Sequence, residues 1–365
     1  MDFNKLFTEK KLRYIGRTYI KNDMLYMNFS GSGIEIKIKS KEIKLVFTGT
    51  KWDDFNSCPY VCILIDGERY DYAIDEKYKS INISLDNNVH NVKILKRTES
   101  SVSHAMLVEV YCDELLEIVE EDKLKIEFYG DSITCGYGSI GNDPLLGFTT
   151  KTESFLDSYA YLTSKKLNAY YSAVCVSGFP IYKSRWNLGF PIESVADMIS
   201  ISDYSEDMTF ETAIRWDNKK YIPDIVVVNL GTNDCSYFTE GQDWVDDLVK
   251  IHGSFDEVLT KDEFISKLLP MKDKIHLFLD SLFKMYGDIK IVWALNMIFV
   301  NSHIDKIVND AIKEYNNPNV YNFKFHSLEK SKDFGTNWHP GKTMHKDAAD
   351  ELSQFILDVV LGGDK

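Results

Sequence analysis

The first third of the chain alternates apolar and polar positions with the period of a half-buried β-strand. Turn sequences such as Ser30-Gly31-Ser32-Gly33 and Asp66-Gly67 separate the alternating stretches. The stretches are residues 34–39, 43–47, 61–65, 81–85, 92–95 and 106–111. Many short strands joined by polar turns, with no helical stretch among them, predict an all-β sandwich of the jelly-roll type over residues 1–118.

The pattern changes near residue 118, beyond which apolar strands alternate with amphipathic helices. Strands are expected at residues 125–129, 170–176, 224–230, 290–295 and 320–323, and helices at 154–166, 264–286, 303–315 and 343–360. This alternation is typical of βα units around a parallel sheet, so residues 119–365 are expected to form an α/β domain of the flavodoxin-like class. The junction at 113–122 is short and acidic, which favours two domains that pack against each other.

Four residues with catalytic potential follow the expected strands of the α/β domain. Ser132 comes after the first strand and Gly178 after the second. Asn233 follows the third strand, and His339 follows the last. Because open α/β sheets bind ligands beyond the carboxyl ends of their strands, we expect these residues to meet at one edge of the sheet.

Ser132 stands in YGDSITCGYG (129–138), and this stretch admits two interpretations. Gly, Asp and Ser are ordinary turn residues, and Asp or Ser often caps a helix. The alternative is a serine nucleophile, which needs a base to take its proton and N–H donors to stabilise the oxyanion. His339 would be the base. The Asn233 amide and the main-chain N–H groups of Ser132 and Gly178 would be the donors.

The four blocks, in the chain order Ser, Gly, Asn and His, resemble those of the SGNH (GDSL-like) hydrolases. The block GDSITCGYG and the β-rich region before it are similar to carbohydrate esterase family 2, as are SGSGIEIKIKS and KILKRTES. The resemblance covers almost the whole chain. It implies a jelly roll on an SGNH domain, removal of acetyl groups from sugars including xylan, no cofactor, and the four site residues named above.

One position departs from the SGNH pattern, which has an aspartate three residues before the histidine. Thr336 stands at that position, and a neutral threonine cannot stabilise an imidazolium as a carboxylate does. Family 2 esterases can work with a Ser–His dyad whose ring is held by a main-chain carbonyl. The resemblance therefore implies a carbonyl near Trp338, or the Thr336 side chain, as the partner of His339. Asp333 is the third alternative.

Aromatic residues near the strand ends are candidates for sugar binding. Tyr182 and Trp338 each neighbour a catalytic block, so we expect both to line the substrate cleft. Trp186 is a weaker candidate. Trp293 lies inside an apolar strand and is expected in the core.

No pattern of metal ligands is evident in the sequence. The six cysteines and the remaining histidines lack the paired spacing of a zinc site, so no metal is expected. His345 is the competing base, six residues after His339, and we expect it to be a solvated helix residue.

The net charge and the lengths of the apolar runs restrict the classes of binding partner. The 365 residues carry a formal net charge of −14, which argues against binding to nucleic acid or to an acidic membrane surface. No apolar run is long enough to span a bilayer, and no signal peptide is evident, so we expect a cytoplasmic protein. Exposed sandwich edges favour a homo-oligomer.

The sequence therefore favours a serine carbohydrate esterase that acts on acetylated saccharides such as xylan or xylo-oligosaccharides. Its acetyl-enzyme would form on Ser132 with His339 as base. The alternatives are an SGNH lipase or thioesterase with a longer acyl pocket, and a non-catalytic carbohydrate-binding protein.

Overall fold

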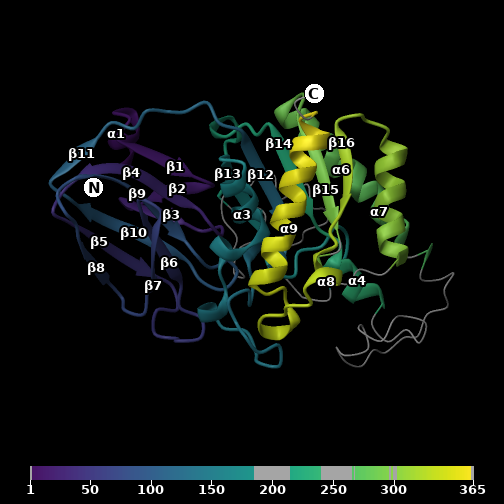
Figure 1. The fold of residues 1–365 in the computed structure, drawn as a ribbon, viewed down its shortest axis with the longest axis horizontal. Helices are drawn as coiled ribbons and strands as arrows, with labels where there is room; N and C mark the ends of the chain where they lie inside the picture. Colours follow the sequence, from purple (N-terminus) through teal and green to yellow (C-terminus); the bar gives the residue numbers. More distant parts are fainter. Residues whose placement is uncertain are drawn as a thin grey trace.

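The chain forms two domains that lie side by side, as a computed structural model shows (Figure 1). The structure describes residues 2–184, 214–239, 265–266, 268–295, 297–298 and 302–362. The N-terminal domain consists of antiparallel sheets, and the C-terminal domain has a parallel sheet covered by helices. This confirms the predicted fold class.

Two antiparallel sheets build the N-terminal domain. Its strands are β1 (Leu12–Ile15), β2 (Thr18–Lys21), β3 (Met24–Met27), β4 (Gly33–Lys39), β5 (Glu42–Gly49), β6 (Tyr60–Ile65), β7 (Glu68–Ala73), β8 (Lys79–Ser84), β9 (Val89–Lys96), β10 (Ala105–Tyr111) and β11 (Glu114–Leu116). One sheet has the order β1-β4-β9-β6-β7, with β11 beside β4, and the other has the order β2-β3-β10-β5-β8. The alternating apolar side chains form one buried cluster, as the period-2 pattern predicts.

The sequence pattern missed five strands of this domain. Strands β1, β2 and β3 have four residues each and β11 has three, too few to show a clear alternation, and the six-residue β7 has no fully buried side chain. The expectation of no helical stretch is wrong, because α1 (Phe3–Thr8) forms at the N-terminus. Its helical turn is capped by the Asp2 carboxylate, and Phe3 is buried in the sandwich core.

The parallel sheet of the second domain contains β12 (Lys125–Gly130), β13 (Tyr170–Cys175), β14 (Ile225–Asn229), β15 (Lys290–Leu295) and β16 (Val320–Lys324). Its order is β13-β12-β14-β15-β16, the flavodoxin-like arrangement. Helices α3 (Tyr159–Lys166) and α9 (Lys342–Phe355) contribute to the apolar cluster on one face. Helices α6 (Pro270–Tyr286) and α7 (Ser302–Tyr315) contribute to the cluster on the other.

Helix starts differ from expectation where local capping intervenes. Helix α3 begins five residues later than predicted, because Ser158 caps it and residues 155–157 form a 3₁₀ turn. Helix α6 begins at Pro270, a residue suited to the first helical turn. The predicted start of this helix at residue 264 lies outside the described residues.

A buried ion pair joins the two domains. Arg17, in the turn between β1 and β2, donates to Glu127 on β12 at 3.0 Å and to the Tyr129 hydroxyl at 2.8 Å. The Glu127 carboxylate also accepts hydrogen bonds from the hydroxyl groups of Ser172 and Tyr286. These bonds satisfy charges that are costly to bury, and they confirm that the domains pack against each other.

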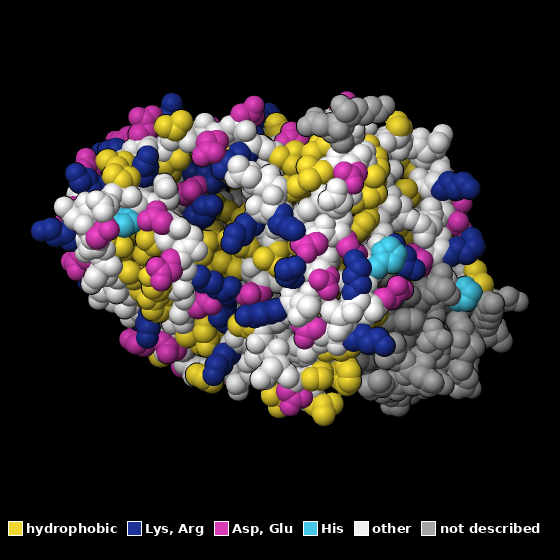
Figure 2. Space-filling model, viewed as in Figure 1, with side chains coloured by type: hydrophobic (Ala, Val, Ile, Leu, Met, Phe, Trp, Pro, Cys, Tyr) yellow, Lys and Arg dark blue, Asp and Glu magenta, His cyan; other side chains and the backbone are white. Residues whose placement is uncertain are grey.

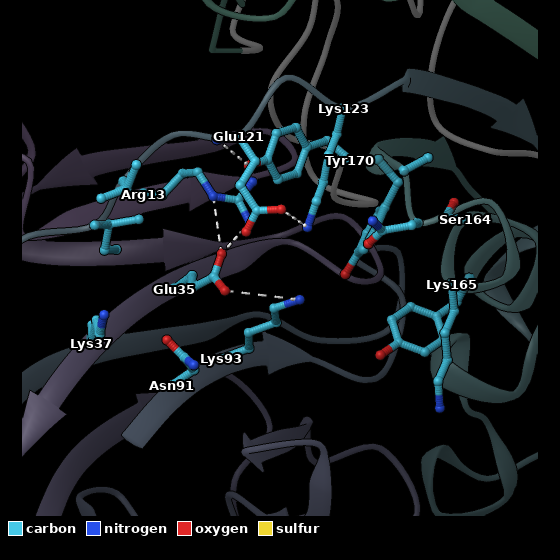
Figure 3. A pocket seen from close by; sticks show the side chains of 16 residues that line it. Arg13, Glu35, Lys37, Asn91, Lys93, Glu121, Lys123, Ser164, Lys165 and Tyr170 are labelled. Atoms are coloured by element: carbon cyan, nitrogen blue, oxygen red, sulfur yellow. Dashed lines mark hydrogen bonds and ion pairs between the residues drawn. The ribbon is translucent and has the colours of Figure 1, made fainter. Parts of the chain in front are cut away.

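A polar groove lies where the first sheet of the sandwich meets β13 (Figure 3). The guanidinium carbon of Arg13, on β1, is 4.0 Å from the centroid of the Tyr170 ring. Arg13 also pairs with Glu35 on β4, and Lys93 Nζ lies 4.0 Å from the other Glu35 oxygen. The groove is thus bridged by a cation–π contact and an ion-pair network.

Acidic and basic side chains are interspersed over the face of the molecule drawn in Figure 2, without a large patch of either sign. None of the helices in the described ranges is both long and apolar enough to cross a membrane.

Candidate active site

Ser132 is the first residue of a short helix at the carboxyl end of β12, an interior strand of the sheet. Strand β12 ends at Gly130, and α2 (Ser132–Cys135) begins directly after Asp131. Asp131 caps this helix, because its carboxylate accepts the Ile133 N–H at 3.0 Å. A Cβ at Gly130 would come within 1.9 Å of Thr134 Oγ1, so only glycine allows so tight a bend.

His339 meets Ser132 directly. Its Nε2 lies 2.9 Å from Ser132 Oγ, and its Nδ1 lies 2.9 Å from the main-chain oxygen of Asn337. An Nδ1–H donated to that carbonyl leaves Nε2 as an acceptor facing the serine hydroxyl. This is the hydrogen-bonding pattern of a nucleophile and its general base.

The turn that carries His339 has an unusual backbone. Asn337 and Trp338 have φ values of 53° and 57°, in the left-handed region that non-glycine residues seldom adopt. Such residues cost about 1–3 kcal/mol each and persist where the surroundings enforce them. Here the Asn337 N–H donates to the Leu146 carbonyl at 3.1 Å, and the Thr336 N–H donates to the Gly138 carbonyl at 3.0 Å.

Tyr137 supports the imidazole from the serine side of the site. Its ring centroid lies 4.1 Å from that of His339, and its other neighbour is Phe148 at 4.0 Å. Its hydroxyl accepts a hydrogen bond from Asn337 Nδ2 at 3.2 Å. Sequence reasoning missed this residue, although it stands inside the quoted decapeptide.

The two other candidate partners of His339 have different places. The Asp333 carboxylate accepts the Thr343 N–H at 2.7 Å, at the start of α9. The buried Thr336 Oγ1 has no hydrogen-bond partner among the described residues. Of the three alternatives, the structure places the main-chain carbonyl, that of Asn337, against the ring.

Gly178 and Asn233 lie beside the serine turn. The Val176 N–H donates to the Gly130 carbonyl at 3.2 Å, which brings the loop after β13 alongside this turn. Gly178 has a φ of 80°, which favours glycine. Asn233, at the start of α4 (Thr232–Thr239), donates through Nδ2 to Asp131 Oδ2 and to the Phe179 carbonyl, both at 3.1 Å.

Two buried carboxyl groups, those of Asp131 and Asp234, lie next to Asn233 and to the loop after β13. Burial raises the pKa of Asp131 to about 7 and that of Asp234 to about 6, and the pKa of Asp131 is raised further by the Asp234 charge. Asp234 accepts the main-chain N–H groups of Ile181, Tyr182 and Lys183 at 2.7–2.9 Å. The carboxylates thus fix the loop after β13 and the Asn233 amide.

The remaining candidates fall into three groups. Tyr182 and Trp338 are both half-buried, and Trp338 packs edge-on against Phe334. Trp186 lies outside the described residues. The expectation of a solvated His345 is wrong: it is fully buried, accepts the Tyr159 N–H at 3.1 Å, and burial lowers its pKa to about 3.

One group of potential metal ligands occurs in the part of the chain that the structure describes. Ligand atoms of Glu99, Cys135 and Glu153 lie within 4.8 Å of one another, and all three residues are buried. Burial raises the pKa of the Cys135 thiol well above its ordinary value. The Glu99 oxygens accept hydrogen bonds from Ser101 and Ser177. This arrangement fits a hydrogen-bonded network better than a metal site.

Comparison with known families gives two matches. Residues 126–352 match the family described as GDSL-like Lipase/Acylhydrolase. Residues 14–120 match the family described as Carbohydrate esterase 2 N-terminal.

Comparison with individual proteins also finds carbohydrate esterases. The chain is 27% identical over 335 residues to the cellulase/esterase CelE of Acetivibrio thermocellus, covering 90% of this chain and 37% of that protein. It is 24% identical over 238 residues to an acetylxylan esterase / glucomannan deacetylase of Cellvibrio japonicus, covering 63% of each. The fold matches a family two carbohydrate esterase from Clostridium thermocellum in complex with cellohexaose, with a TM-score of 0.77, 23% identity, and coverage of 96% and 99%. The chain thus spans less than two thirds of either curated relative.

Proposed function

Because this chain belongs to the GDSL-like lipase/acylhydrolase family and carries the N-terminal domain of carbohydrate esterase family 2, we propose that it is a serine esterase that deacetylates saccharides. The observation that carries the proposal is the contact of His339 Nε2 with Ser132 Oγ at 2.9 Å. The sequence-based alternatives of a lipase, a thioesterase and a binding protein become outcomes of the test below.

In the first half of the reaction, Ser132 Oγ attacks the acetyl carbonyl carbon while His339 Nε2 takes the hydroxyl proton. The imidazolium that forms keeps its Nδ1–H on the Asn337 carbonyl, whose dipole takes the place of an aspartate. The tetrahedral intermediate collapses when Nε2–H protonates the sugar oxygen, and this releases the deacetylated saccharide. The acetyl group remains on Ser132.

In the second half, His339 takes a proton from water, and the resulting nucleophile attacks the acetyl-enzyme carbonyl. Collapse of this intermediate returns the proton to Ser132 Oγ and releases acetic acid, which ionises in water to acetate and a proton. Each turnover therefore consumes one water molecule and yields one deacetylated saccharide and one acetic acid.

The oxyanion of both intermediates needs aimed N–H donors. The Ser132 N–H belongs to the first turn of α2, where a helix has no internal acceptor. The Gly178 N–H lies on the neighbouring loop. The Asn233 amide holds Asp131 and the Phe179 carbonyl, so we propose that it shares one of these hydrogens with the oxyanion.

Acetylated xylan or xylo-oligosaccharides are the proposed substrates. The support is the activity of the Cellvibrio japonicus relatives, acetylxylan esterase / glucomannan deacetylase, together with Tyr182 and Trp338 as proposed sugar contacts. The predicted cytoplasmic location and homo-oligomer stay predictions.

Hydrolysis of p-nitrophenyl acetate, butyrate and octanoate by wild type and Ser132→Ala tests the proposal. We expect fast cleavage of acetate only, lost in the variant, and release of acetate from acetylated xylo-oligosaccharides. Preference for the longer esters would indicate the lipase or thioesterase. Equal background rates in both proteins, with oligosaccharide binding intact, would indicate a binding protein.

A further inference from the structure

A buried carboxylate of the sandwich domain reaches into the α/β domain. Glu99 lies in the loop that joins β9 to β10, within the stretch KILKRTES, and it has no exposed surface. A buried carboxylate is costly unless hydrogen bonds compensate its charge, so its contacts show what this position requires.

Both oxygens of Glu99 hold the same residue of the α/β domain. Oε2 accepts the Ser177 main-chain N–H at 2.8 Å, and Oε1 accepts the Ser177 hydroxyl. The Ser101 hydroxyl donates to Oε2 as well. Ser177 immediately precedes Gly178, whose N–H is a proposed oxyanion donor.

Glu99 is itself fixed by neighbours of the sandwich and of the junction. Its main-chain N–H donates to Glu153 Oε1 at 3.1 Å, and its carbonyl accepts Lys96 Nζ at 2.6 Å. Burial and the adjacent Glu99 charge raise the pKa of Glu153 well above its ordinary value. A raised pKa favours the protonated form of Glu153, which weakens the repulsion between the two carboxyl groups.

The loop after β13 is thus held by a carboxylate at each end. Asp234 of the α/β domain holds residues 181–183, whereas Glu99 of the sandwich holds Ser177. Between the two lie the turn closed by the Phe179 N–H and the Val176 carbonyl at 3.2 Å, and the Gly178 N–H. One of the two carboxylates that hold this loop, Glu99, therefore belongs to the other domain.

We propose that Glu99 is a positioning residue through which the sandwich domain aims the Gly178 N–H at the oxyanion. This inference rests on the proposed esterase function. Donors that stabilise developing charge must be held before the reaction, and a small displacement of one of them slows the chemical step. Loss of Glu99 should therefore lower kcat and leave KM for p-nitrophenyl acetate nearly unchanged, because the oxyanion forms only after the ester is bound.

Two single variants and one control test this role on p-nitrophenyl acetate. We expect Glu99→Ala to lower kcat about tenfold and Ser177→Ala, which keeps the main-chain bond, about threefold, with KM within about twofold of wild type. Arg69→Ala is the control, because Arg69 also bridges the domains through Asp157 at 2.7 Å and Ser154 at 2.9 Å, away from Ser177. Its kcat should stay within about twofold of wild type.

The double variant Glu99→Ala/Ser177→Ala separates positioning from a general loss of stability. If both residues act through one contact, the double variant is no slower than Glu99→Ala alone. Multiplied effects, or an equal loss of kcat in Arg69→Ala, would overturn the proposal. Unchanged kcat in a folded Glu99→Ala would also overturn it.

Amide hydrogen exchange of the segment 176–181 gives a readout that does not depend on catalysis. Exchange at Ser177 should be at least tenfold faster in Glu99→Ala than in wild type and unchanged in Arg69→Ala. If Glu99→Ala does not fold, Ser177→Ala serves, and wild-type kcat in that variant would overturn the proposal. Absence of ester hydrolysis by wild type would refute the proposed function, while exchange still reports whether Glu99 holds the turn.

Discussion

The two halves of the candidate dyad are held in opposite ways. Ser132 follows β12, a strand paired on both sides, and starts a helix, and buried carboxyl groups hold the neighbouring residues. His339 follows two residues with left-handed backbone, and a main-chain carbonyl holds its ring. The nucleophile depends on regular structure and titratable groups, whereas the base depends on an irregular turn without a carboxylate.

This difference shows how an SGNH-type site can lack the usual aspartate. A carboxylate partner would keep a negative charge beside the ring while the ring is neutral. The Asn337 carbonyl carries no net charge, and the left-handed backbone at Asn337 and Trp338 fixes its direction. Holding the ring in this way costs conformational free energy of the backbone.

Removal of the base should have the largest effect. His339→Ala should lower kcat on p-nitrophenyl acetate by about a thousandfold or more, because Ser132 then has no proton acceptor. Steady-state kinetics with Ser132→Ala as reference measure this. A variant that keeps a tenth of wild-type activity would mean that another group activates the serine.

Asn233→Ala should lower kcat about a hundredfold, the cost of one oxyanion donor. Asn233 also donates to Asp131 Oδ2, which precedes Ser132 and does not belong to a proposed sugar contact. The substitution should therefore lower kcat and leave KM unchanged. Unaltered kcat would remove Asn233 from the proposed oxyanion hole.

Tyr137 belongs to the serine block of the sequence and supports the histidine half of the site, and we expect its ring to matter more than its hydroxyl. Tyr137→Ala should lower kcat about tenfold, because the imidazole loses the ring that packs on its face. Tyr137→Phe keeps that ring and loses only the bond from Asn337, so we expect a loss of about threefold or less. Equal losses in the two variants would show that the hydroxyl bond to the strained turn is the important contact.

The sequence predicts the serine half of the site better than the histidine half. Strands such as β4, with alternating burial, can be recognised from the sequence pattern. The order of the parallel strands then brings Ser132, Gly178 and Asn233 to one edge of the sheet. The neighbourhood of His339 depends on the backbone conformation of non-glycine residues, which side-chain periodicity does not encode.

Contacts between distant segments were equally beyond sequence reasoning. Glu99 and Ser177 are 78 positions apart and belong to different domains. His345 lies on the buried face of α9, at the helical spacing of Ala348 and Leu352, and the expectation of solvation followed its residue type instead of this spacing. Its contact with the Tyr159 N–H of α3 depends on tertiary packing, which the local pattern does not give.

The carboxyl groups of the serine half predict a pH effect on stability. The pKa of Asp131 is raised by burial to about 7, so the folded state holds a proton that the unfolded state has released. The contribution of Asp131 to stability is therefore greatest below its unfolded pKa, near 4, and is lost as pH rises to about 7. The Asp131→Asn side chain does not titrate. The free energy of unfolding of this variant minus that of wild type should therefore increase by roughly 1 kcal/mol for each pH unit between about 4 and 7.

Chemical denaturation of both proteins at pH 4.5, 5.5, 6.5 and 7.5 measures this gain, and a constant difference between them would contradict it. Thr343→Ala, on the histidine half, is the control, because the difference between its free energy of unfolding and that of wild type should not change over this range.

Loss of the Asp333 carboxylate should have the smallest effect on turnover. Asp333→Ala tests most directly whether the histidine half works without a carboxylate. Its carboxylate accepts the Thr343 N–H at the start of α9, so Asp333→Ala should cost about 1 kcal/mol of stability, as loss of a helix cap does. Because the Asn337 carbonyl holds His339, kcat should stay within about threefold of wild type. Asp333→Asn keeps an oxygen acceptor and should recover most of the stability. A hundredfold loss of kcat in Asp333→Ala at unchanged fold would mean that this carboxylate orients the imidazole during turnover, and the contrast between the two halves would then disappear.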